Sequence, residues 1–132
     1  MLSPARSLAA LLQPQPLGLA RTGVGLSMLA LPGLVPAVLG VQAPACTAMA
    51  WAMQMLGARE IAVGLGGATA SRSADPQAAR AWLAAGLLCD AVDALAVAGA
   101  VGRGRLRPGP GAALIAVAVA ATAIQAAALG RR

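Results

Sequence analysis

The 132-residue sequence contains no histidine, lysine, phenylalanine, tyrosine or asparagine, and very few acidic residues. Without histidine there is no imidazole base and no usual transition-metal ligand, and without lysine or tyrosine there is no Schiff base or phenolic acid. The ionisable side chains that remain are carboxylates, arginines and two thiols. We therefore expect a protein that is not an enzyme and has neither a cofactor nor a metal site.

Charged residues are also scarce. They make up 11% of the chain and hydrophobic residues 59%, against about 25% and roughly 45–50% in soluble domains. A membrane span uses about 20 residues, so four spans would take up nearly the whole chain. The dominance of Ala, Gly, Leu, Val, Pro and Arg is typical of a GC-rich bacterial coding sequence. We predict an all-α fold, a four-helix transmembrane bundle forming one membrane domain over residues 1–132, in the bacterial plasma (inner) membrane.

Proline, glycine and charge divide the chain into helices. Pro32 would end the first helix, and residues 33–44 are interpreted as either a buried connection or a broken helix. Asp75 is a predicted N-cap with Pro76 at the first helical position. The segment 103–111 combines Arg, Gly and Pro and is predicted to lie outside any helix. The expected helices are 16–31, 45–70, 76–101 and 112–129.

The net charge of +6 comes entirely from arginine. The arginines lie between apolar runs, which favours contact with lipid phosphates over nucleic acid. Because the bias in composition removes most aromatic residues, Trp51 and Trp82 are the remaining interfacial anchors. Four spans place both termini on one side, and the distribution of arginines then favours cytoplasmic termini. That side would carry Arg6, Arg72, Arg80, Arg131 and Arg132, and the opposite side Arg103, Arg105 and Arg107.

The second expected helix carries a stripe of mostly small residues. They recur at alternating steps of four and three, a spacing that lets another membrane helix approach closely. Because Glu60 lies within this stripe, we expect it to face protein rather than lipid. The stripe comprises Cys46, Ala50, Met53, Gly57, Glu60, Gly64 and Gly67.

Charged residues of the second and third helices are predicted to lie at one depth. Arg59 and Glu60 precede Asp75 by 16 and 15 residues, and Asp90 follows it by 15. At about 1.5 Å per residue, an antiparallel hairpin puts them about 20 Å from its turn, near the bilayer centre. Asp93 shares a face with Asp90. An unpaired charge there is costly, so we expect Arg59 to pair with Asp90 or Asp93.

Arg21 completes the candidate site, a buried charged cluster of Arg21, Arg59, Glu60, Asp90 and Asp93. Arg21 would either extend outward to the membrane edge or join Glu60. Three carboxyl groups then face two cations, and burial favours a neutral carboxyl, so one is expected to hold or share a proton. The cluster therefore has two interpretations: it orders the bundle, or it binds a proton or cation for transport.

The two cysteines carry little functional information. Cys46 lies near one end of its expected helix and Cys89 near the middle of the next, about 20 Å away in the antiparallel hairpin. That separation is too large for a disulfide. We predict that both are small packing residues.

A family resemblance follows from three features: the run Gly57-Ala58-Arg59-Glu60 with Gly64, the Asp75-Pro76 helix start, and the run Asp90-Ala91-Val92-Asp93-Ala94. From about Leu17 onward the chain resembles small bacterial four-helix membrane proteins of unknown function, distantly similar to the DoxX type. The resemblance implies a four-helix fold and an inner-membrane location, without an established activity.

The leading functional hypothesis is a multi-pass membrane protein whose charged cluster orders the bundle. The alternatives are a proton- or cation-coupled carrier and a membrane redox subunit, although neither histidine nor a paired cysteine motif supports redox chemistry. The expected partner is the lipid bilayer and not nucleic acid. A homo-oligomer or a membrane partner protein stays open.

Overall fold

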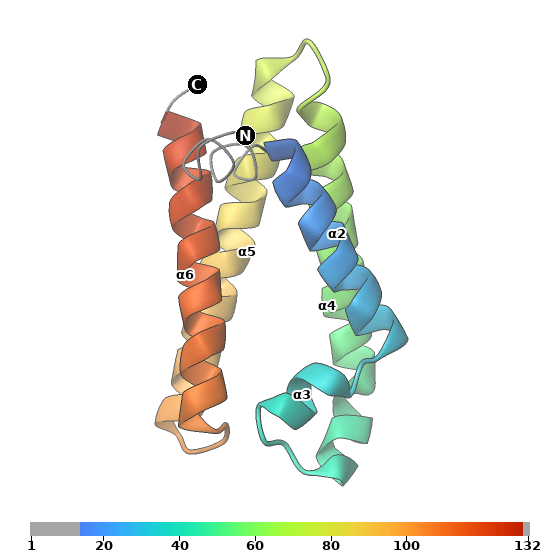
Figure 1. Cartoon of the computed structure of the whole chain (residues 1–132), viewed down its shortest axis with the longest axis vertical. Coiled ribbons are helices and arrows are strands. Elements are labelled where there is room, and N and C mark those ends of the chain that lie inside the picture. Colours follow the sequence, from blue (N-terminus) through green and yellow to red (C-terminus); the bar gives the residue numbers. More distant parts are fainter. Residues whose placement is uncertain (1–13, 131–132) are drawn as a thin grey trace, which may run out of the picture.

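The computed structural model describes residues 14–130, and this part of the chain is helical without a strand. Four long helices and one short helix follow one another (Figure 1). They are α2 (Pro14–Ala30), α3 (Leu34–Val38), α4 (Ala43–Ala70), α5 (Pro76–Gly102) and α6 (Pro108–Gly130).

The long helices form two antiparallel pairs. Helix α2 packs along α4, and α5 packs along α6, whereas α4 and α5 contact each other less extensively. The connection 71–75 joins the pairs at one end of the molecule, and α3 and the α5–α6 turn lie at the other end (Figure 1). The space between the pairs is therefore bounded by all four long helices.

The start of α5 agrees with the sequence prediction. Asp75 is the N-cap, its Oδ1 accepts a hydrogen bond from the Gln77 backbone N–H at 2.8 Å, and Pro76 begins the helix. The cap satisfies one of the amide groups that a helix start leaves without an intrahelical partner.

The helix bounds lie within about two residues of the approximate predicted ones, except for the start of α6. Helix α6 begins at Pro108 rather than residue 112. The N–H groups of a first helical turn have no intrahelical partner, and proline has no N–H, so Pro108 and Pro110 fit in this turn. For the same reason α4 begins at Ala43, with Pro44 in its first turn, rather than at residue 45. Between α2 and α4, the segment predicted as a connection or a broken helix contains α3.

Paired glycines set the packing of α2 against α4. A Cβ atom at Gly18 would lie 2.5 Å from the Gly64 carbonyl oxygen, and one at Gly25 would lie 2.5 Å from that of Gly57. In both pairs the two residue numbers add up to 82, as expected for two antiparallel helices that pack in one register. The glycines thus allow the close backbone contact that larger residues would prevent, and they place Arg21 beside Glu60 and Ile61.

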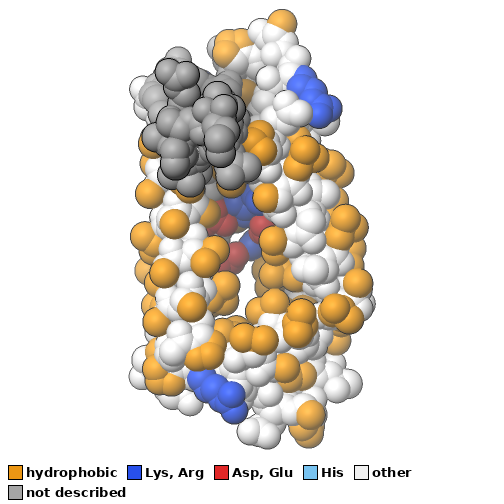
Figure 2. Space-filling view, viewed as in Figure 1, with side chains coloured by type: hydrophobic (Ala, Val, Ile, Leu, Met, Phe, Trp, Pro, Cys, Tyr) orange, Lys and Arg blue, Asp and Glu red, His pale blue; other side chains and the backbone are white. Residues whose placement is uncertain are grey.

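The outer surface of the helices is apolar. Large hydrophobic side chains are exposed on every long helix, including Leu95 at 74% and Val117 at 66% exposure. In Figure 2 hydrophobic side chains are spread along the length of the molecule, with charged side chains at its ends and in the hollow between the helix pairs. Among the described residues, two helices are long and apolar enough to cross a membrane, Pro76–Gly102 and Pro108–Ala127. Helix α2 has 17 residues, and the middle of α4 contains charged residues. Four spans were predicted, and length and composition support two.

Candidate functional site

A charged cluster lies between the two helix pairs, and Arg21 of α2 is at its centre. The Arg21 Nη2 atom lies 2.8 Å from Glu60 Oε2 of α4, and Nη1 lies 2.8 Å from Asp90 Oδ2 of α5. All three side chains are 11–12% exposed. One guanidinium group therefore joins both helix pairs through two charge-assisted hydrogen bonds, the stronger kind in proteins.

The second guanidinium group, that of Arg59, extends the cluster toward a more open region. Its Nη1 donates to Asp93 Oδ1 at 3.1 Å and its Nη2 to Asp93 Oδ2 at 2.5 Å, a bidentate arrangement. Nη2 also donates to Glu60 Oε1 at 3.0 Å. The side chains of Arg59 and Asp93 are 30% and 39% exposed, so this end of the cluster is open while the Arg21 end is nearly enclosed.

Gln125 of α6 completes the cluster and was not predicted. Its Nε2 donates to Asp90 Oδ2 at 2.5 Å and to the Ala121 carbonyl at 3.2 Å, and the residue is only 2% exposed. Gly86 makes room for it, because a Cβ atom there would collide with the Gln125 side-chain oxygen. A signal was available: Gln125 is the single long polar side chain of α6, and such a group inside an apolar helix needs a partner.

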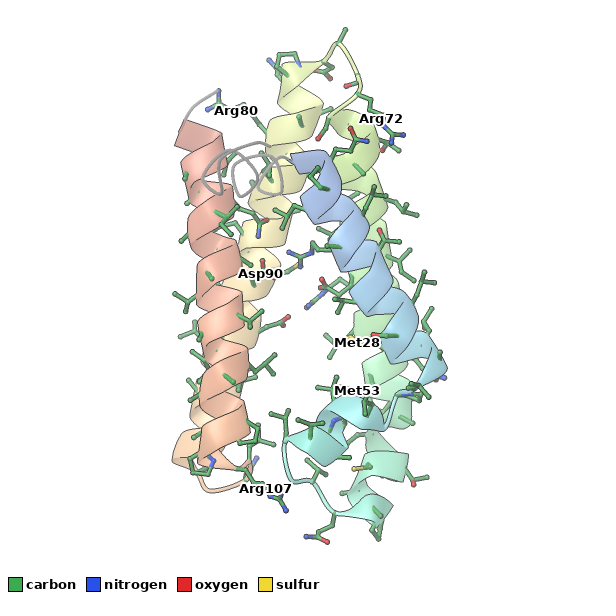
Figure 3. The ribbon with its side chains drawn as sticks, viewed as in Figure 1. Met28, Met53, Arg72, Arg80, Asp90 and Arg107 are labelled. Carbon is green, nitrogen blue, oxygen red and sulfur yellow. The ribbon has the colours of Figure 1, made fainter. Side chains whose placement is uncertain are left out.

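The contacts form a continuous chain across the molecule. It runs from Asp93 through Arg59 and Glu60 to Arg21, and then through Asp90 to Gln125. Each of the four long helices contributes at least one side chain. Figure 3 shows Asp90 directed from α5 toward the space between the pairs, and Figure 2 shows charged side chains at the upper end of a hollow between them.

The structure brings together all five side chains that the sequence analysis singled out. Of the two partners expected for Arg59, the contact is with Asp93. Arg21 joins Glu60 instead of extending outward, and it also contacts Asp90, which had not been expected. Counting residues along the α4–α5 hairpin thus placed the charged side chains of α4 at the same level as those of α5.

The predicted stripe on α4 is partly buried. Cys46, Gly57, Glu60 and Gly64 are buried, and the two glycines contact α2. Gly67 is less enclosed, and a Cβ atom there would only touch Trp82 at 4.0 Å. The stripe therefore packs against α2 through its central part.

The two cysteines are both free. Cys46 is buried, and its Sγ lies 3.3 Å from the Val41 carbonyl oxygen, to which it donates a hydrogen bond. Cys89 is partly exposed on α5.

The chemistry available to the cluster is that of charge pairing and ion binding. Two guanidinium groups face three carboxyl groups, so full ionisation leaves one excess negative charge. Within residues 14–130, no group of three or more histidine, cysteine or acidic residues is arranged to hold a metal ion. Comparison with protein-family models, curated proteins and solved structures finds no match to this chain.

Proposed function

We propose that the chain is a four-helix, multi-pass integral membrane protein of the bacterial plasma membrane, in which the charged cluster orders the bundle. The observation that carries this proposal is a buried polar cluster surrounded by helices whose large apolar side chains are mostly exposed. The buried polar side chains within residues 14–130 are Glu60, Asp90 and Gln125, whereas large apolar side chains face outward. Soluble proteins bury apolar groups and rarely expose wide apolar surfaces.

Helices α2 and α4 fit this proposal although their composition is less apolar than that of α5 and α6. Their mid-helix charges, Arg21, Arg59 and Glu60, are directed into the cluster and are paired there. Most of their large outward side chains are apolar, as Leu26 at 55% and Met55 at 65% exposure illustrate. In lipid, charges that face the bundle interior and pair with one another are the arrangement expected.

The ends of the molecule also suit a bilayer. Trp51 lies near the α3 end of α4, Trp82 lies near the opposite end on α5, and both are exposed, as interfacial tryptophans are. Arg72 and Arg80 lie at one end and Arg107 at the other (Figure 3). If four spans place both termini at the Arg72 end, the terminal arginines of the sequence add to the positive charge of that end, and the positive-inside rule then favours cytoplasmic termini. Arg6, Arg131 and Arg132 are outside the described residues.

Membrane integration is tested by extraction. We expect the protein to stay in the membrane fraction after washing with alkaline carbonate, and to be released by detergent. Release by carbonate alone would overturn the proposal. The fraction of protein resistant to washing is measured by immunoblotting against an epitope added at either terminus.

The ordering role is tested by a double-mutant cycle on Arg59 and Asp93. Arg59→Ala and Asp93→Ala should each lower the free energy of unfolding in detergent, and the double variant should lose less than the sum. Strictly additive losses would show that the pair does not stabilise the bundle. Thr69→Ala, whose hydroxyl bonds only to its own helix, is a matched control.

A second function, a proton- or cation-coupled carrier, is favoured by one observation. Asp93 is 39% exposed toward the more open end of the cluster, and the three carboxyl groups outnumber the guanidinium groups. Acidic side chains that face a bundle interior or a cavity within a membrane commonly mark ion pathways. In reconstituted vesicles, Glu60→Gln and Asp93→Asn should fold and abolish pH-driven uptake. Absence of any flux in the parent protein would exclude this function.

The similarity to DoxX-type proteins and a homo-oligomer or partner protein stay predictions. The two free thiols give no support to the alternative of a membrane redox subunit.

A further inference from the structure

The turn between α5 and α6 concentrates positive charge at one end of the molecule. Arg103, Arg105 and Arg107 occur within five residues, and all three are exposed. This set of three side chains is referred to as the arginine turn. It lies at the α3 end, opposite the connection 71–75 (Figure 1).

The arginine turn has no acidic counterpart in the protein. The whole sequence contains 4 acidic residues, Glu60, Asp75, Asp90 and Asp93. Three of them belong to the buried cluster, and Asp75 caps α5 at the opposite end. No acidic side chain of the chain is therefore available to the arginine turn, which leaves it free to pair with an anion from outside the chain.

Arg107 also connects the two helix pairs. Its backbone N–H donates to the Leu39 carbonyl at 2.9 Å. Its side chain lies over Gly40, which has a positive φ of 87° and where a Cβ atom would be 2.5 Å from Arg107 Cγ. The arginine turn is consequently held against the segment between α3 and α4.

Apolar side chains border the same end. Leu31, Leu34 and Val38 are 58%, 53% and 57% exposed, although they are not part of a long helix. A ligand at this end thus meets cationic groups beside apolar surface. A free inorganic anion would use only the first of these, whereas a phospholipid uses both.

We propose that the arginine turn, with the adjoining α3 segment, binds the phosphate headgroup of an anionic phospholipid. Guanidinium groups match phosphate geometry through paired N–H donors, and clusters of arginine next to a membrane attract anionic lipid. Because Arg107 bridges to Leu39 and Gly40, a bound headgroup contacts both helix pairs and stabilises their association. This inference rests on the proposed membrane location.

The experiment compares lipid binding by purified protein in a neutral detergent. Native mass spectrometry measures the dissociation constants of phosphatidylglycerol and of phosphatidylcholine for the parent and for Arg103→Gln/Arg105→Gln. Arg107 is left unchanged because it packs on Gly40. Loss of a single hydrogen bond to a charged phosphate corresponds to about a tenfold change, so the double variant should bind phosphatidylglycerol at least about tenfold more weakly. Phosphatidylcholine should bind equally weakly to both.

The matched control is Arg72→Gln/Arg80→Gln, which removes the same charge from the opposite end and should keep the parent's affinity for phosphatidylglycerol. Equal loss in the control would overturn the proposal, as would equal binding of the two lipids by the parent. Displacement of the lipid by millimolar inorganic phosphate would also overturn it, by indicating a free-anion site. Carbonate extraction of the same variants reports membrane integration separately, so failure of lipid selectivity with intact integration leaves the proposed function standing.

Discussion

Replacing Arg21 with methionine should destabilise the protein more than replacing Arg59 with methionine. Arg21 joins Glu60 and Asp90, and these three side chains are nearly enclosed. Removing one partner of a buried ion pair costs about 3–5 kcal/mol because a charge is left without compensation. Glu60 keeps Arg59 and Asp90 keeps Gln125, so we expect a loss near the lower limit, about 3 kcal/mol.

The corresponding loss for Arg59 should be smaller. Its bidentate partner Asp93 is 39% exposed, and we expect water in the hollow between the helix pairs to solvate it when the guanidinium group is removed, while Glu60 keeps Arg21. Exposed ion pairs contribute about 1 kcal/mol or less. We therefore expect about 1 kcal/mol for Arg59→Met, which leaves a difference of about 2 kcal/mol between the variants.

The assay is reversible unfolding in mixed micelles, with the free energy of unfolding extrapolated to zero denaturing detergent. Adding Asp90→Asn to Arg21→Met should restore at least part of the loss, because it removes the uncompensated charge and keeps a hydrogen-bond acceptor for Gln125. Asp90→Asn alone serves as the control. If Arg59→Met proved as costly as Arg21→Met, burial would not determine the energy of these pairs, and the reasoning would be wrong.

Three further predictions concern other parts of the chain. Gly25→Ala should lower stability by about 1–3 kcal/mol because of overpacking against α4, whereas Gly23→Ala, with nothing within 4 Å, should be neutral or stabilising; equal effects in thermal unfolding would contradict the α2–α4 register. Asp75→Ala should cost about 1 kcal/mol through loss of the N-cap, measured by the same unfolding, and Asp75→Ser should recover most of it. Trp51 and Trp82, each studied alone, should be quenched best by lipids brominated near the headgroup; strongest quenching at the bilayer centre would refute their interfacial position.

The sequence predicted the relative depth of the charged residues because depth depends only on counting along one hairpin. Asp75 and Pro76 mark the helix start, and the distances from that start to Glu60 and Asp90 follow from helix geometry. The partner of Arg59 was left open between two carboxyl groups, since one turn of helix separates them. Which one is contacted depends on how the helices rotate.

The roles of Arg21 and Gln125 depend on which helices are neighbours, and a single sequence gives this only indirectly. Gly18 and Gly25 are seven residues apart, as are Gly57 and Gly64, and this equal spacing was the available signal for the α2–α4 register. Gln125 gave a weaker signal, because a lone long polar side chain in an apolar helix indicates that it needs a partner but not which one. Its contact with Asp90 requires α6 to return along α5, which becomes evident only in three dimensions.

The division of the charged cluster between the helix pairs has a consequence for assembly. With all groups ionised, the α2–α4 pair contributes Arg21, Arg59 and Glu60, a sum of one positive charge, and the α5–α6 pair contributes two negative charges from Asp90 and Asp93. Each half alone would retain uncompensated charge, and the halves attract each other. The gene divided within the connection 71–75 should therefore yield two fragments that recognise each other when they are co-expressed, and neither fragment should persist alone.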